Sequence, residues 1–225
     1  MATHLITGAG SGIGAALADV LHERGDALVL VARSQERADD LASRYDGAVT
    51  LVADLSYVES LAALDLPEAL DSVVHAAGAV DLGTVAELTA RQWREQLDVN
   101  LLAPAELTRL ALPALRAAKG TVVFVNSGAG LRANPEWAAY AASKHGLRAL
   151  ADALRAEEQD AGVRITSVYP GRTATPMQAK VHDQEGKEYD AGDWIQPETV
   201  ADAIRHVLDL PRDAVIPDVT VSPAP

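Results

Sequence analysis

The sequence predicts an α/β fold in which a doubly wound parallel sheet of about seven strands carries helices on both faces. Short, continuous apolar runs alternate with segments of helical periodicity along the 225 residues, which is typical of βαβ units with right-handed crossovers. The runs lack the polar alternation of a half-exposed sheet, so we expect strands that are buried on both faces. The length fits a single domain, and no repeat, low-complexity tract or linker divides residues 1–225.

A glycine-rich turn, TGAGSGIG at residues 7–14, separates the first apolar run from the first helix. Gly8 allows a tight turn, Gly12 lets the backbone approach a pyrophosphate, and Gly14 lets helix and strand pack closely. We expect an anion to be faced by Gly8, Ser11, Gly12, Ile13 and Gly14. The setting favours a Rossmann-type dinucleotide site, and the alternative is an ordinary turn between strand and helix.

The second apolar run, residues 27–32, ends at Arg33 and Ser34. A Rossmann-type unit that binds NAD often has an acidic residue here to hold the ribose 2′-hydroxyl, whereas this chain has Ala32 followed by a cation. Arg33 could hold a 2′-phosphate in a charge-assisted pair, so we favour NADP(H) over NAD(H). The alternative is a solvated arginine before the next helix, which we expect to begin at Ser34 as N-cap.

The third strand is expected at residues 49–53, and a weak helical link follows at 56–70. Between them lie Asp54 and Leu55, at the carboxyl end of the strand. Asp54 could accept a hydrogen bond from an adenine amino group, or it could cap the next turn, and the sequence leaves both open.

The fourth strand, residues 72–75, runs into the small residues Ala76, Ala77 and Gly78. Small side chains there would let the backbone lie against a flat ligand. We interpret His75, the last residue of the strand, as structural. Residues 89–118 then predict one long helix, which Pro104 should kink because proline lacks the N–H of a helical hydrogen bond.

The second half of the chain continues the alternation. We expect strands at 121–125 and 164–168, a helix at 140–161, and a last helix at 197–208. A final short strand falls at 215–216 or 219–221, before a frayed tail at 222–225. Residues 176–194 are polar, with little periodicity, and we interpret them as a mobile lid over the substrate.

Composition excludes several classes of function. The net charge of −13 argues against nucleic acid as a partner, because phosphate binding needs a basic face. The absence of cysteine removes disulfides, thiolate catalysis and cysteine-bound metals, and we expect no metal site. We find no secretory signal and no apolar run near the roughly 20 residues that span a bilayer. We therefore expect a cytoplasmic protein without a membrane partner.

Tyr140 and Lys144 form the chemical centre of the sequence. They lie four residues apart, so a helix places them on one face. A phenol with a pKa near 10 is a poor base at neutral pH, and a nearby ammonium lowers that pKa. The alternative is a helical pair without chemistry. Ser127 ends an earlier strand, at the edge of the sheet where ligands of open α/β folds bind.

The combined pattern resembles the short-chain dehydrogenase/reductase family. The resemblance covers about residues 3–175 and depends on five features in the family's order: residues 7–14, Asn100, Ser127, Tyr140-x-x-x-Lys144 and Pro170-Gly171. One departure is Ala76, where the family usually has asparagine, and its loss would weaken cofactor binding. The early end of the chain removes the basis for transferring the family's usual tetramer, and we expect a homodimer at least, through helices 89–118 and 140–161.

The resemblance implies a role for each matching residue. Tyr140 would be the general acid/base, and Ser127 would hydrogen-bond the substrate oxygen. Lys144 would bind the nicotinamide ribose and lower the pKa of Tyr140, and Asn100 would hold a water in a proton relay. The nicotinamide carboxamide and the phosphates would be held after the sixth strand by Pro170, Gly171, Thr173 and Thr175.

These residues predict an NADP(H)-dependent oxidoreductase that interconverts a ketone or aldehyde and its alcohol. One alternative is a catalytically silent, dinucleotide-binding regulator or sensor, which would not need all four of Asn100, Ser127, Tyr140 and Lys144. Another is a family member that performs non-redox carbonyl chemistry with the same residues.

Overall fold

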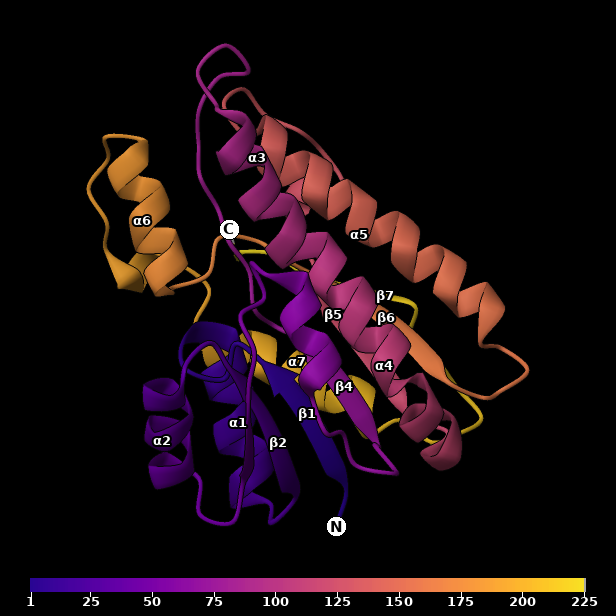
Figure 1. Cartoon of the computed structure of the whole chain (residues 1–225). Helices are drawn as coiled ribbons and strands as arrows, with labels where there is room; N and C mark the ends of the chain where they lie inside the picture. Colours follow the sequence, from indigo (N-terminus) through magenta and orange to yellow (C-terminus); the bar gives the residue numbers. More distant parts are fainter. Residues whose placement is uncertain (225) are drawn as a thin grey trace.

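The computed structural model describes residues 1–224 and confirms the predicted sheet. Seven parallel strands form one sheet in the order β3-β2-β1-β4-β5-β6-β7, with the order reversing between β1 and β4 (Figure 1). The strands are β1 (Thr3–Thr7), β2 (Ala27–Ala32), β3 (Val49–Val52), β4 (Ser72–His75), β5 (Thr121–Val125), β6 (Arg164–Pro170) and β7 (Asp218–Val221). The carboxyl ends of the strands lie together at one end of the sheet. In open α/β sheets, ligands bind at this end, beside the point where the strand order reverses.

Helices cover both faces of the sheet, as predicted. They are α1 (Gly12–Glu23), α2 (Gln35–Arg44), α3 (Ala90–Leu97), α4 (Ala103–Ala118), α5 (Ala138–Glu157), α6 (Pro176–Gln184) and α7 (Pro197–Leu208). Helices α1, α2 and α7 pack on one face, and α4 and α5 on the other. Successive residues of each strand supply the two cores: Leu5 faces α4 and α5, whereas Ile6 faces α1 and α7.

The long helix expected at 89–118 is interrupted. Helix α3 ends at Leu97, a π-helical turn spans Asp98–Leu102, and α4 begins at Ala103. Pro104 explains the position of the break, because its missing N–H is the one that would donate to the Asn100 carbonyl in an α-helix. The prediction of a kink is therefore confirmed, and the prediction of one continuous helix is wrong. The turn places the Asn100 side chain in the interior.

Residues 176–184 form helix α6, although their sequence shows little helical periodicity. Pro176 takes its first position, and the Thr175 hydroxyl caps it by accepting a hydrogen bond from the Gln178 N–H at 3.2 Å. Helix α6 stands apart from the helices that cover the sheet (Figure 1). In the predicted tail, residues 222–224 are exposed and Pro225 lies outside the described residues.

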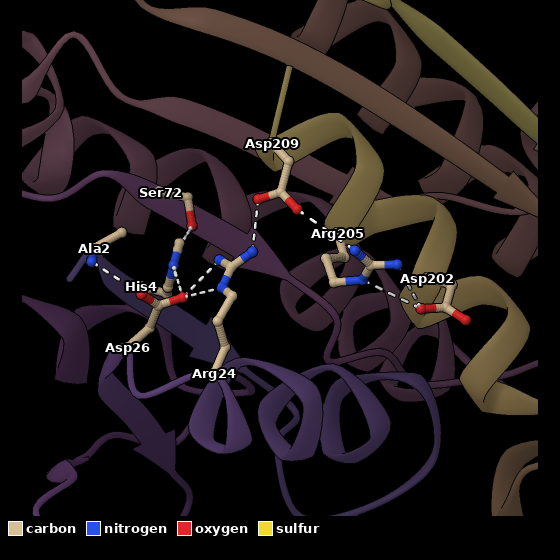
Figure 2. A network of polar contacts seen from close by, with 8 residues as sticks. All are labelled: Ala2, His4, Arg24, Asp26, Ser72, Asp202, Arg205 and Asp209. Carbon is tan, nitrogen blue, oxygen red and sulfur yellow. Dashed lines mark hydrogen bonds and ion pairs between the residues drawn. The ribbon is translucent and has the colours of Figure 1, made fainter. Parts of the chain in front are cut away.

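The amino end of the sheet carries a polar network, shown in Figure 2. The carboxylate of Asp26 accepts hydrogen bonds from the Ala2 N–H at 3.0 Å and from Arg24 at 2.6 Å. Buried His4 contacts Ser72 at 2.7 Å, and Arg24 also pairs with Asp209 at 2.6 Å. This network ties strands β1 and β4 to the turn that follows α1.

Candidate active site

The glycine turn lies at the carboxyl end of β1, as predicted. Gly8 and Gly12 have positive φ angles of 76° and 56°, which favour glycine. A Cβ at Gly14 would lie 2.4 Å from the Gly8 carbonyl oxygen, and one at Gly8 would lie 2.7 Å from the Ala77 nitrogen. The glycines therefore let strand, turn and helix touch through their backbones.

The first turn of α1 is open to an anion. Its N-cap residue, Ser11, makes no capping hydrogen bond with its side chain, and no acidic residue lies in the first turn. Gly10 is exposed, and a Cβ there would meet nothing within 4 Å. A Cβ at Gly12 would come within 2.9 Å of the Thr175 methyl group, so the loop after β6 walls the opposite side. Half-buried Ile13 packs against the core. Free N–H groups and a helix dipole at an open turn fit a pyrophosphate.

Arg33 and Ser34 follow β2 beside this turn. Arg33 is exposed and forms no ion pair with another residue in the range 1–224. Ser34 is the N-cap of α2, as predicted, and accepts a hydrogen bond from the Arg37 N–H at 3.3 Å. The Arg33 guanidinium is therefore available to a ligand.

The structure assigns Asp54 one of its two expected roles. Its Oδ1 atom accepts hydrogen bonds from the Ser56 N–H at 2.9 Å and from the Ser56 hydroxyl at 2.7 Å, so Asp54 caps the turn after β3. Leu55 is half-buried against the core formed by β4 and α4. The contact of Asp54 with adenine stays a prediction.

The turn after β4 is fixed from both sides. The Ala77 N–H donates to the Thr7 hydroxyl at 3.2 Å, which joins it to β1. A Cβ at Gly78 would lie 3.2 Å from the Met177 side chain, which places α6 over this turn. Ala76 and Ala77 are half-buried. His75 is buried, contacts the Thr108 hydroxyl at 2.9 Å and stacks on Phe124, which agrees with a structural role.

Tyr140 and Lys144 lie on one face of α5, and both are buried. The Lys144 ammonium lies 5.8 Å from the centre of the Tyr140 ring and donates a hydrogen bond to the Val125 carbonyl at 2.9 Å. Burial lowers the pKa of Lys144 to about 8, because the surroundings disfavour its charge. Burial, and to a lesser extent the charge of Lys144, lowers the pKa of His75 to about 3.

The pKa of the phenol is not lowered in the structure, in contrast to the expectation for Tyr140 beside Lys144. Burial raises the pKa of Tyr140, and the Ser127 hydroxyl, which lies beside the phenol, opposes that shift. The Lys144 ammonium is bonded to the backbone of β5. Tyr140 is therefore protonated at neutral pH.

Ser127 is held by Asn126, which the sequence reasoning missed. The side-chain oxygen of Asn126 accepts a hydrogen bond from the Ser127 N–H at 2.9 Å. The side-chain nitrogen of Asn126 donates to the Lys144 backbone carbonyl at 3.1 Å. A Cβ at Gly130 would lie 2.4 Å from that oxygen, so the loop closes tightly on the amide. Asn126 thus joins β5 to the middle of α5. A buried polar residue directly before Ser127 was the available signal.

Asn100 is fully engaged by its neighbours. Its side-chain amide donates to the Ala79 carbonyl and accepts from the Ala79 N–H, both at 2.8 Å, and it donates to the Ser143 hydroxyl at 3.0 Å. The side chain therefore clamps the loop after β4 to α5. The water that Asn100 is expected to hold stays a prediction. The backbone carbonyl of Asn100 suits this role better than its engaged side chain, because Pro104 has no N–H to donate to that carbonyl.

The loop after β6 reaches back to the glycine turn. The Gly171 N–H donates to the Val221 carbonyl at 2.8 Å, directly after Pro170 at the end of β6. Thr173 donates to the Gly171 carbonyl at 3.0 Å, and Thr175 donates to the Thr173 carbonyl at 3.2 Å. The predicted residues of β1, β2, β4, β5, α5 and β6 thus gather at one edge of the sheet.

Comparison with known proteins agrees with this arrangement. The family described as short chain dehydrogenase matches residues 2–186. An oxidoreductase of Schizosaccharomyces pombe described as uncharacterized is 34% identical over 195 residues, 84% of this chain and 78% of the relative. One from Staphylococcus epidermidis is 28% identical over 226 residues, 97% of this chain and 96% of the relative.

Solved structures are similar over the whole chain. An alcohol dehydrogenase from Thermococcus sibiricus, complexed with 5-hydroxy-NADP, has a TM-score of 0.84 at 28% identity and covers 98% of this chain and 96% of its own. A putative NAD(P)-dependent gluconate 5-dehydrogenase from Beutenbergia cavernae, with bound NADP, has a TM-score of 0.82 at 30% identity and covers 98% and 95%. The chain therefore belongs to the short-chain dehydrogenase/reductase family, and it is an oxidoreductase of that type. Across residues 1–224, every helix is too short or too polar to cross a membrane.

Proposed function

We propose that this oxidoreductase uses NADP(H) to interconvert a ketone or aldehyde and its alcohol, with Tyr140 as the acid/base. The observation that carries the proposal is the meeting of Tyr140, Ser127 and Lys144 at the sheet edge that also holds the open glycine turn. A phenol, a hydroxyl and an ammonium at one ligand-binding edge suit transfer of a proton to or from a substrate oxygen.

The chain's own residues supply the proton chemistry. The buried Tyr140 phenol is protonated at neutral pH, so it can donate to the oxygen of a carbonyl as that oxygen gains negative charge. The Ser127 hydroxyl, fixed by Asn126, would hydrogen-bond the same oxygen and stabilise the charge. Bound nicotinamide would supply or accept the hydride. Lys144 would hold the ribose once its ammonium leaves the Val125 carbonyl.

Three features support the cofactor and its phosphate. The uncapped first turn of α1 fits a pyrophosphate, and the small residues 76–78 fit a flat group. Arg33 is exposed and unpaired within residues 1–224, which fits a 2′-phosphate. Two structural relatives at 28% and 30% identity are described with 5-hydroxy-NADP and NADP. NADP(H) is therefore the cofactor we favour over NAD(H).

Oxidation of NADPH or NADH in the presence of neutral aldehydes and ketones tests the proposal. We expect turnover of at least one carbonyl, and more efficient turnover with NADPH. Cofactor binding by titration, without turnover of any carbonyl or alcohol, would instead identify a silent dinucleotide-binding regulator. Turnover of a carbonyl substrate without a change in the cofactor would identify non-redox chemistry.

We further propose a dimer at least, formed through α4 and α5. Both helices pack on the same face of the sheet (Figure 1). Leu102, at the start of α4, is 47% exposed, and a second copy of the chain would cover it. Light scattering that gives 23.6 kDa at all concentrations would contradict the dimer. The lid role of residues 176–194 and a cytoplasmic location stay predictions.

A further inference from the structure

An apolar cluster surrounds the Tyr140 phenol, and its composition indicates the class of substrate. The cluster contains Val80, Leu82, Ala129, Trp137, Met177 and Val181. Four separate segments contribute to it: the loop after β4, the loop after β5, the start of α5, and α6. Trp137 stands edge-on to the Tyr140 ring at 5.7 Å. Four segments thus pack around one phenol, and we call this cluster the apolar wall.

Part of this wall is accessible. Tyr140, Val80 and Val181 are buried, whereas Trp137 and Met177 are only partly covered. Met177 reaches from α6 to the Gly78 backbone, where a Cβ would lie 3.2 Å away. The apolar side chains therefore extend from the catalytic phenol to the turn that we assign to the cofactor.

The cations of α6 and of the loop after β6 are already paired. Lys180 of α6 donates to the Val80 carbonyl at 2.7 Å and lies 3.4 Å from the Asp81 carboxylate. Arg172 pairs with both oxygens of Glu185, at 2.6 and 3.0 Å, and lowers the pKa of that carboxyl. A carboxylate on the substrate would have to displace one of these pairs or remain unpaired beside apolar side chains, which is costly.

Whole-molecule charge acts in the same direction. The net charge of −13 repels an anionic substrate at long range. Arg132 is an exposed cation on the loop between β5 and α5, so it belongs in the test. A cationic substrate would gain from the net charge but would lose its hydration against the apolar wall.

We infer that the substrate is an uncharged carbonyl compound, or the matching alcohol, whose carbonyl carbon bears an aromatic or branched alkyl group. The inference rests on the proposed function and deepens it. The apolar group lies against Trp137 and Met177, the partly exposed members of the cluster, while the oxygen faces Tyr140 and Ser127. Neutrality is favoured because the charges of Lys180 and Arg172 are already paired, and Lys144, whose ammonium lies 5.8 Å from the Tyr140 ring, is assigned to the ribose.

Two pairs of aldehydes of matched shape test the inference. The first is 4-tert-butylbenzaldehyde with 4-(trimethylammonio)benzaldehyde, and the second is methyl 4-formylbenzoate with 4-formylbenzoate. We expect kcat/KM to be at least about tenfold higher for the neutral member of each pair. Equal or higher kcat/KM for either charged member would overturn the inference. If the protein prefers 4-formylbenzoate and Arg132→Ala loses that preference, Arg132 is the group that binds the carboxylate.

Variants of the wall provide a second measurement. Met177→Lys should raise the kcat/KM ratio of 4-formylbenzoate to its methyl ester, and Trp137→Ala should lower kcat/KM for the tert-butyl compound more than for propanal. Val85→Ala is the matched control, because Val85 is 71% exposed and lies outside the cluster. An unchanged ratio in Met177→Lys would contradict the assignment of the wall.

The two proposals fail in different ways. Turnover of propanal together with a preference for charged aldehydes removes the substrate class and leaves the oxidoreductase mechanism standing. No turnover of any aldehyde with either cofactor, although the cofactors bind, removes the proposed function and this inference with it.

Discussion

The two ends of the parallel sheet both bury polar side chains, but they do so differently. At the amino end, the Asp26 carboxylate meets the Arg24 guanidinium at 2.6 Å, and Arg24 also meets Asp209 (Figure 2). At the carboxyl end, Lys144 is buried with only a backbone carbonyl, Val125, as its hydrogen-bond partner within residues 1–224. Opposite charges therefore compensate each other at one end and not at the other.

This difference separates architecture from chemistry. A buried carboxylate with a charged partner favours one folded arrangement, and the pKa of Asp26 is lowered by hydrogen bonds from Ala2 and Arg24 despite its burial. An uncompensated buried ammonium lowers stability, and it is retained where a ligand supplies the missing partner. Substitutions at the two ends should accordingly differ in which property they change.

The largest effect is expected for Tyr140→Phe. This change keeps the ring and its contact with Trp137 but removes the proton that we assign to catalysis. We expect kcat to fall by about 10²–10⁴-fold, with cofactor affinity and stability nearly unchanged. Steady-state kinetics and a cofactor titration measure both. Near-full turnover in the variant would remove the catalytic assignment.

At the other end of the sheet, Asp26→Asn should lower the free energy of unfolding by about 2 kcal/mol and leave kcat unchanged. Because Arg24 is partly exposed, the loss should lie below that of a fully buried pair. The folded pKa of Asp26 is lowered, so its contribution is present above its unfolded pKa, near 3.9, and is lost as the pH falls through the folded pKa.

Urea denaturation at pH 7 and pH 3 measures this effect. The unmodified protein and the variant should differ less at the lower pH. A loss of kcat in Asp26→Asn without a loss of stability would show that the amino end serves catalysis after all, and would erase the distinction between the two ends.

Lys144→Met should change stability in the opposite direction. The lowered pKa, about 8 against 10.5, disfavours the folded state by about 3 kcal/mol at neutral pH. The lost bond to the Val125 carbonyl offsets part of this, so we expect a net gain of about 1–2 kcal/mol without cofactor. Turnover and cofactor affinity should both fall.

The pH dependence provides the control for Lys144. A lysine with a lowered folded pKa binds fewer protons in the folded state between about pH 8 and 10.5, so stability attributable to it rises with pH in that range. The advantage of Lys144→Met should therefore shrink as the pH rises. A constant difference, measured by denaturation across that range, would contradict the assigned cause.

The smallest effect is expected for Arg33→Ala. We expect a loss of about 1–2 kcal/mol in NADPH affinity, because one exposed charge-assisted contact disappears, and little change for NADH. Fluorescence titration of both cofactors measures the difference, with Arg37→Ala as a neighbouring control. Equal affinities of the unmodified protein for NADPH and NADH would contradict the cofactor preference.

Continuous apolar runs made the strands predictable, because a strand that is buried on both faces is built mainly from apolar residues. Residues 27–32 and the helix at 197–208 form as predicted. Helix α6 escaped prediction because a short polar segment gives little periodicity, and its caps, Thr175 and Pro176, only act once the loop after β6 is in place.

The site divides in the same way. Motif spacing placed Ser127, Tyr140 and Lys144 at one sheet edge, because the fold brings strand ends together. Spacing carries no information on where a flexible ammonium points, so the bond from Lys144 to Val125 and the raised pKa of Tyr140 required the structure. The support from Asn126 was hidden for the same reason, since its partner in α5 is distant in sequence.

The backbone contact between Gly8 and Gly14 limits how this protein can evolve. A single methyl group at Gly14 would overlap the Gly8 carbonyl oxygen at 2.4 Å, so even alanine requires the strand and helix to separate. Arg33 is under no such restriction, because its side chain lies in solvent. Selection or engineering can therefore alter the contact that we propose for the cofactor 2′-phosphate at this surface position while the turn itself stays fixed.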